Sequence, residues 1–120
     1  MEGWCEQFAK DVAEARGLSN ENREERRLKI EQTLHAIKVG QIPPTRIFDV
    51  IRAHVIINLA GNDVEQDDAI GALEQTVEKQ PTGLNYLLLY AALLVLAKDR
   101  NAEELKDKAT LLLDKVALPE

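Results

Sequence analysis

The sequence predicts an all-α fold of five to six helices arranged in antiparallel hairpins. Apolar residues recur at helical spacing along almost the whole chain, and no stretch alternates with the period of two that a half-buried strand requires. Glycine and proline stand where such helices would end. With 120 residues, the chain is long enough for one domain, spanning 1–120, with one hydrophobic core. We expect either an irregular bundle or a short stack of helical hairpins.

Two helices are predicted before Gly40. The first has an apolar face made of Trp4, Phe8, Val12 and Ala15, and Gly17 is expected to end it. Ser19 or Asn20 supplies the N-cap of the second helix, because these side chains accept a hydrogen bond from the first helical turn. Its core-facing residues are Ile30, Leu34 and Ile37. Gly40 ends this helix, and Pro43 with Pro44 prevents it from continuing.

A third helix is predicted from Pro44 or Thr45 to about Ala60. Its β-branched residues also favour a strand, but a run of about 15 residues exceeds the usual strand length. Apolar side chains surround too much of this helix for it to lie on the surface. They are Ile47, Phe48, Val50, Ile51, Val55, Ile56, Ile57 and Leu59.

Three more helices are predicted after Gly61. Asn62 or Asp63 caps the fourth, which reaches Lys79 and has an apolar stripe of Ile70, Leu73 and Val77. The fifth, from about Leu84 to Lys98, is apolar on nearly every side. Asn101 is expected to cap the sixth, which Pro119 ends. The apolar stripe of the sixth is Leu105, Ala109, Leu112 and Val116.

A spacing of 38 residues separates Pro43 from Pro81 and Pro81 from Pro119. With this offset, apolar and capping positions of 44–81 align with those of 82–120, and 1–43 would be a divergent third unit. Such a period is typical of helical repeat proteins. Two adjacent helical hairpins of equal length would align in the same way without common ancestry, so both interpretations stay open.

Charge and composition restrict the classes of partner. The net charge is −6, and all of it lies in 61–120, which contains 6 basic and 12 acidic residues. Nucleic-acid binding needs a positive footprint, so no nucleic-acid partner is expected. Cys5 is the only cysteine, the N-terminus does not resemble a signal peptide, and the apolar run 84–97 is too short to cross a bilayer. We therefore expect a cytoplasmic protein without a membrane partner.

The predicted fifth helix carries the main functional hypothesis. Tyr86 and Tyr90 are one turn apart, and Leu93 continues their face. On the surface, such an aromatic strip would anchor another protein or a second copy of the chain. The same pattern is also expected of core packing. The chain would then be a small non-catalytic interaction module, such as an adaptor, chaperone or scaffold.

The excess of acidic residues in the second half of the chain supports an alternative function. An inhibitor or immunity-type protein would block a basic partner through 61–120, and the attraction would speed their association. His54 and Asn58 are also predicted to bind the partner, as a polar pair in a pocket, and a more remote alternative is an enzyme with a site near them. These residues are four apart on the predicted third helix and so face the same way. A hydrogen-bonded polar seam between helices explains the pair equally simply, and we favour it.

No motif in the chain predicts a cofactor or a metal. His35 and His54 lie on different predicted helices, and no zinc-binding pattern accompanies them. The segment 63–74 places acids at several positions of a calcium loop. However, Asp68 stands where that loop requires glycine, and acids are expected anyway at the start of a helix. We expect neither a cofactor nor a metal site.

Overall fold

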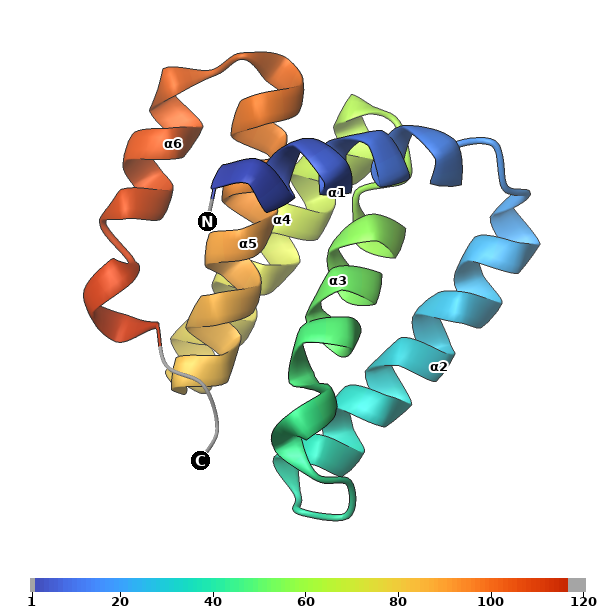
Figure 1. Cartoon of the computed structure of the whole chain (residues 1–120), viewed down its shortest axis with the longest axis vertical. Helices are drawn as coiled ribbons and strands as arrows, with labels where there is room; N and C mark the ends of the chain where they lie inside the picture. Colours follow the sequence, from blue (N-terminus) through green and yellow to red (C-terminus); the bar gives the residue numbers. More distant parts are fainter. Residues whose placement is uncertain (1, 117–120) are drawn as a thin grey trace.

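The computed structural model describes residues 2–116, and it confirms the all-α fold (Figure 1). Within these residues there are six α-helices and two short 3-10 helices, with no strand. The α-helices are α1 (Glu2–Ala15), α2 (Asn20–Lys38), α3 (Ile47–Asn58), α4 (Asp63–Lys79), α5 (Gly83–Arg100) and α6 (Glu103–Thr110). The 3-10 helices are η1 (Pro44–Arg46), which leads into α3, and η2 (Leu113–Lys115), which follows α6.

Helix α5 forms the centre of the fold. It packs against α1, α3, α4 and α6, so almost every side of it meets another helix. This explains why its sequence has no polar face: Leu88 and Leu93 are at most 1% exposed although, five residues apart, they point to different sides of the helix. The Thr82 side chain accepts a hydrogen bond from the backbone N–H of Asn85 and thereby fixes where α5 begins.

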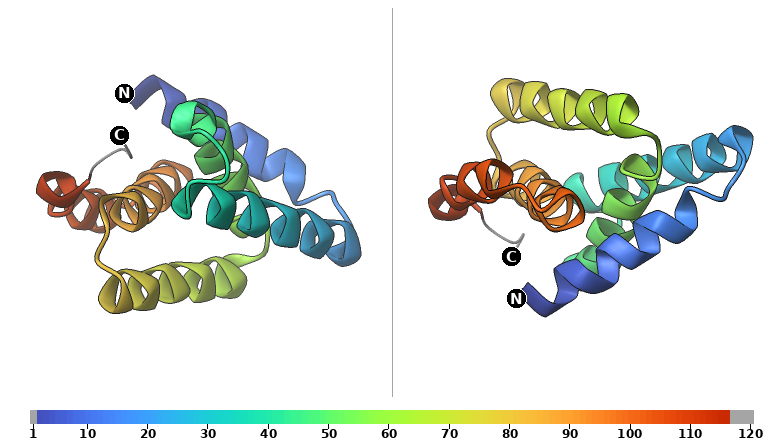
Figure 2. Two further views of the ribbon diagram at one scale, coloured as in Figure 1. Left: turned by 90° about the horizontal axis from the view of Figure 1, so that it is seen from below. Right: turned by 90° about the horizontal axis from the view of Figure 1, so that it is seen from above.

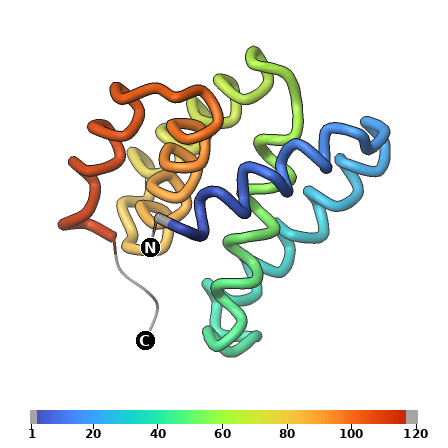
Figure 3. The backbone as a smooth tube through the Cα atoms, turned by 45° about the horizontal axis from the view of Figure 1, so that its top comes forward, coloured from blue at the N-terminus to red at the C-terminus, as the bar shows by residue number. Residues whose placement is uncertain are grey.

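The other helices surround α5 in a fixed arrangement. Helix α1 crosses one side of α3 and α5, and α4 lies on the opposite side (Figure 2). Helix α6 packs along α5 at one edge of the molecule, whereas α2 packs along α3 at the other edge (Figure 3). As a result, α2 packs on α3 and α4 packs on α5, but α2 and α4 are not close neighbours of each other.

Both ends of α2 follow the signals that the sequence contains. Ser19 caps α2, because its hydroxyl oxygen accepts from the backbone N–H of Asn22 at 3.3 Å. Gly40 has a φ of 80°, which lies in the left-handed region that glycine adopts without a steric penalty. Its neighbour Gln41 donates its backbone N–H to the carbonyl of Ala36, so the end of α2 is closed by a backbone cap.

Close helix pairs do not follow the predicted hairpin units. The antiparallel pairs are α2 with α3, α4 with α5, and α5 with α6. Helix α1 packs on α3 and α5 rather than on α2, and α3 does not pack closely on α4. Only the unit 82–120 therefore corresponds to a packed hairpin, while the units 1–43 and 44–81 each contain two helices that diverge. The chain is an irregular bundle in which neighbours in sequence are not always neighbours in space.

The last helix differs from its prediction at both ends. Asn101 does not cap α6; it ends α5 with a φ of 51°, and α6 begins after Ala102 without a side-chain cap. Asparagine tolerates this left-handed conformation better than most residues. Helix α6 also ends at Thr110 rather than near Pro119, and Leu112 and Val116 pack against the core through the tighter turns that follow. No glycine or proline marks this change in the sequence.

Candidate functional site

A cleft between α2 and α4 is the candidate site. It has a volume of about 250 Å³. The central helices α3 and α5 form its floor, and α2 and α4 flank it without packing closely on each other. Leu34, Leu73 and Leu88 supply its apolar lining. Its polar lining consists of Glu31, His35, Lys38, His54, Thr76, Gln80 and Asn85. The cleft is therefore half-open and as polar as it is apolar, and its polar groups converge on one concave surface, as they do in ligand sites.

Asn85 is a buried polar residue of the cleft, and two hydrogen bonds hold its side chain in place. The side chain is 1% exposed although it belongs to the apolar helix α5. Its amide nitrogen donates to the backbone carbonyl of Gln80 at 2.9 Å, and its amide oxygen accepts from the ammonium of Lys38 at 2.6 Å. Asn85 therefore holds Lys38 in place across 47 residues of sequence.

Lys38 brings a positive charge into the cleft without a negative partner. Its ammonium group makes no ion pair within residues 2–116, and it donates a hydrogen bond to the neutral amide of Asn85. Partial burial lowers the pKa of Lys38, because desolvation disfavours the charged form. A bound anion would remove this penalty, so the group has unused capacity for a negative ligand.

His54 is the second polar group with unused bonding capacity. The side chain is 7% exposed, and burial is the main reason why its pKa falls from 6.5 to about 4, with the positive charges of Lys38 and Arg27 adding to the effect. The ring is therefore neutral at pH 7. Its Nδ1 atom is closed to solvent and has no hydrogen-bond partner. A buried polar atom left unpaired costs about 1–3 kcal/mol.

The tautomer of His54 follows from this environment. A neutral imidazole has one N–H and one acceptor nitrogen. Placing the proton on Nδ1 would bury an unpaired N–H, and unpaired buried N–H groups are rarer than under-satisfied acceptors. Nε2 is not among the closed, unpaired side-chain atoms of the described residues. We infer that Nε2 carries the proton and that His54 presents a neutral N–H donor.

Asn58 does not belong to the cleft. Its amide nitrogen donates to the backbone carbonyl of His54 at 2.9 Å, and its amide oxygen accepts from Nε of Arg27 at 3.1 Å. The first contact lies within α3 and the second joins α3 to α2, and Asn58 is not among the residues that line the hollow. The two residues share a side of α3 as their spacing predicts, but only His54 reaches the cleft.

The tyrosine strip of α5 lies largely in the core. Tyr90 is 7% exposed and Leu93 is fully buried, so neither is presented on the surface of the folded chain. Tyr86 is half-buried, and the ammonium of Lys115 lies 5.4 Å from the centre of its ring. The helical spacing of these residues therefore serves the packing of α5 against its neighbours.

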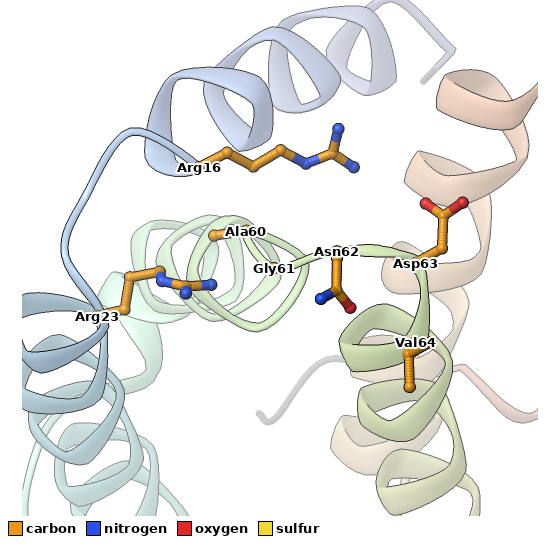
Figure 4. Close-up of a pocket in the computed structure, with 7 residues that line it drawn as sticks. All are labelled: Arg16, Arg23, Ala60, Gly61, Asn62, Asp63 and Val64. Carbon is orange, nitrogen blue, oxygen red and sulfur yellow. The ribbon is translucent and has the colours of Figure 1, made fainter.

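A larger, more open hollow lies at the turn between α3 and α4 (Figure 4). Its volume is about 640 Å³, and Arg16 and Arg23 extend toward the turn from two sides. Each guanidinium already has a carboxylate within 3.4 Å: Asp99 for Arg16 and Glu65 for Arg23. Asp63 adds a further carboxylate to the lining. The hollow therefore offers an anion no surplus of positive charge.

The acidic segment 63–74 is helical from its first residue. Asn62 caps α4 through its side-chain oxygen, which accepts from the backbone N–H of Glu65 at 2.9 Å, so the segment does not adopt a calcium-loop conformation. Within residues 2–116, no group of three or more His, Cys, Asp or Glu side chains is placed to hold a metal ion. In the same range, no helix is long and apolar enough to cross a membrane.

Three polar residues of the cleft, His54, Lys38 and Asn85, contact or face one another, and the sequence predicts only the first of them as a site residue. Asn85 has a signal in the sequence, because it is the one polar residue inside the apolar run 84–97. Lys38 has none, since a lysine in the last turn of a helix is expected anyway. Comparisons with protein-family models, with curated proteins and with solved structures return no significant match.

Proposed function

We propose that this chain is a non-catalytic protein-binding module that receives its partner at the cleft between α2 and α4. The observation that carries the proposal is a cleft lined by both the buried ring of His54 and the ammonium of Lys38, a cation whose hydrogen bond goes to a neutral amide. The unpaired Nδ1 of His54 lowers stability, and partial desolvation disfavours the charge of Lys38. Ionisable groups perturbed in this way cluster at functional sites.

The surroundings of the cleft favour a protein partner over a free small molecule. Leu28 and Val39 are 54% and 53% exposed, and they lie on the same face of α2 as the cleft residue His35, at helical spacings of seven and four residues. A hydrophobic side chain beside a polar pocket is the usual arrangement at a protein interface, where a central anchor is surrounded by contacts that exclude water. A partner seated on α2 would cover both residues and fill the cleft.

The residues that line the cleft favour binding over catalysis. At pH 7 the low pKa of His54 keeps it neutral, so it is not a general acid, and the Thr76 hydroxyl, which a general base would have to activate, donates to the carbonyl of Ala72. The lining contains no serine or cysteine nucleophile. The groups that are present can donate hydrogen bonds to a ligand and hold it.

Affinity capture with matched variants tests the proposed function. The tagged wild-type chain, Lys38→Met and Lys29→Met are used to recover proteins from native lysate. Both substitutions remove one positive charge from α2, but Lys29 is exposed and does not line the cleft. We expect a stoichiometric partner with the wild type and with Lys29→Met, and its loss with Lys38→Met. Equal recovery by all three would reject the cleft as the docking site.

A second candidate function rests on the surface of α4. All six acidic residues of this helix are exposed, and Asp63, Asp68 and Glu78 make no ion pair within the described residues. Such a face supports the acidic inhibitor, which would attract a basic partner over long range. Salt distinguishes the two candidates: recovery through the six exposed acids of α4 should fall steeply as ionic strength rises, whereas recovery through the cleft, whose lining has one lysine, should fall less.

A further inference from the structure

We propose that the cleft binds the C-terminal carboxylate of a partner protein whose last residue is aliphatic, such as leucine or valine. This inference rests on the proposed function and names the chemical group that the same site recognises. It follows from three properties of the cleft: the donors that it presents, the single positive charge that it contains, and the apolar surface beside them.

Two polar groups of the cleft, Lys38 and His54, present donors, whereas Glu31, Thr76 and Gln80 add oxygens that accept hydrogen bonds. The Lys38 ammonium has three N–H groups, and the amide of Asn85 uses one of them. His54 adds the N–H of Nε2. The amide of Asn85 has one bond on each side already, to Lys38 and to the carbonyl of Gln80, so it orients the site rather than offering a free acceptor. Two donors from different helices match the two oxygens of one carboxylate.

The charge in the cleft selects a monoanion over a dianion. Lys38 is the one formally positive side chain in the lining, and Glu31 contributes a negative charge to the same lining. His54 is neutral at pH 7 because burial holds its pKa at about 4. A carboxylate balances Lys38, whereas a phosphate group would leave a second negative charge without a partner near Glu31.

The apolar lining accounts for the rest of the ligand. Leu34, Leu73 and Leu88 are buried residues from three helices that meet in the same hollow. With about 250 Å³, the hollow is smaller than the roughly 300–1,000 Å³ of pockets for drug-sized molecules, which fits a single residue. A chain terminus carries a carboxylate and an aliphatic side chain on the same Cα, so one residue satisfies both the donors and the leucines.

N-acetyl-leucine and N-acetyl-leucinamide are the probes that test this inference. They have the same aliphatic body, and only the first carries a carboxylate. Each is titrated into the ¹⁵N-labelled full chain at pH 7 while the amide signals and the imidazole nitrogens of His54 are followed by NMR. We expect the acid to shift the signals of Lys38, His54 and Asn85, and to bind at least about tenfold more tightly than the amide, as a charge-assisted hydrogen bond requires. Equal affinities, or no shift with either probe, would overturn the inference.

Two controls accompany this titration. The first distinguishes a chain-terminal carboxylate from a side-chain carboxylate, and the second tests the role of Lys38. N-acetyl-glutamic acid α-amide carries its carboxylate on the side chain, and we expect it to bind more weakly than N-acetyl-leucine; equal binding would reject the chain terminus. In Lys38→Met, the affinity for N-acetyl-leucine should fall to that of the amide, and in Lys29→Met it should be unchanged. An unchanged affinity in Lys38→Met would overturn the assignment of the charge.

The outcome is independent of the capture experiment. If the acid fails to bind while a partner is lost with Lys38→Met, the cleft remains the docking site and only the carboxylate assignment falls. If the acid binds while partner recovery is the same with every variant, the carboxylate site stands and the proposed protein partner falls.

Discussion

Two buried polar side chains, Gln66 and His54, show the difference between a structural contact and a candidate binding group. Gln66 is fully buried on α4: its amide nitrogen donates to the carbonyl of Leu59 at 2.7 Å, and its amide oxygen accepts from Arg100 at 3.1 Å. His54 is 7% exposed on α3, yet its Nδ1 atom has no partner. Arg100 is also neutralised by Asp67 at 2.9 Å, whereas Lys38 beside His54 has no carboxylate.

The comparison shows that burial of a polar group does not by itself mark a site. The Gln66 cluster joins the turn after α3 to the end of α5 and uses both ends of its amide, although Nε of its partner Arg100 is buried without a hydrogen bond. The His54 cluster likewise contains a buried nitrogen without a partner, but its residues line a hollow. The hollow, together with a cation that has no carboxylate partner, distinguishes the second cluster from the first.

Substitution at Gln66 should have the largest effect on stability. In Gln66→Leu, the carbonyl of Leu59 and the guanidinium of Arg100 lose their shared partner inside the protein. We expect the free energy of unfolding to fall by about 1–3 kcal/mol, because the carbonyl of Leu59 is left unpaired in the core, whereas Arg100 keeps its contacts to Asp67 and Asp63. Urea unfolding measures this change. Gln75→Leu, at an exposed position of the same helix, is the control and should change stability little. A similar small change at Gln66 would show that its cluster is dispensable.

Acid should destabilise the wild type through His54. In the unfolded chain the pKa of His54 is near 6.5, and in the folded chain it is about 4, so the unfolded state binds more protons between these values. Stability therefore falls as the pH decreases from about 6.5 to about 4. The full effect is about 3 kcal/mol, from 1.36 kcal/mol for each unit of pKa.

His54→Leu isolates this contribution from that of the carboxylates. The charged or titratable groups around the ring are Lys38 and Arg27, with Glu31 and His35 in the same cleft. Urea unfolding of both proteins between pH 4 and pH 7 gives the difference in stability at each pH. The difference should widen in favour of the variant as the pH falls; a constant difference would contradict the low pKa.

A smaller effect is expected on the pKa of His54 when Lys38 is changed. The charge of Lys38 contributes to the lowered pKa, but burial contributes more. In Lys38→Met, the pKa should rise above about 4 and stay below 6.5. NMR titration of the imidazole signals measures it, with Lys29→Met as the control that should leave it unchanged. An unchanged pKa in Lys38→Met would show that Lys38 and His54 are too far apart to bind one ligand together.

The fold was predictable from the sequence because its signals are local. Helical spacing, the caps Ser19 and Asn62, and the left-handed Gly40 are each read within one or two turns. The end of α6 at Thr110 was not predictable, since continued helical spacing and the absence of glycine or proline both favour a longer helix. Tertiary packing decides such a boundary.

The cleft was only partly predictable because it depends on contacts between distant residues. Lys38 and Asn85 are 47 residues apart, and no local pattern brings them together. Gln66 and Asn85 do share a signal, because each is a polar residue in a position that the pattern assigns to the core. The sequence does not separate the two, however, because it does not show that Asn85 bonds Lys38 beside a hollow whereas Gln66 bonds Arg100, which also pairs with Asp67.

The stability of His54→Leu at pH 7 tests the central claim most directly. If His54 is retained for binding, replacing it with leucine removes an unpaired buried nitrogen and should raise the free energy of unfolding by about 1 kcal/mol, as measured by urea unfolding. If His54 instead supports the fold through a contact that it makes in the core, the same substitution should lower the free energy of unfolding by about 2 kcal/mol or more. A loss of that size would contradict the account of the cleft as a binding site.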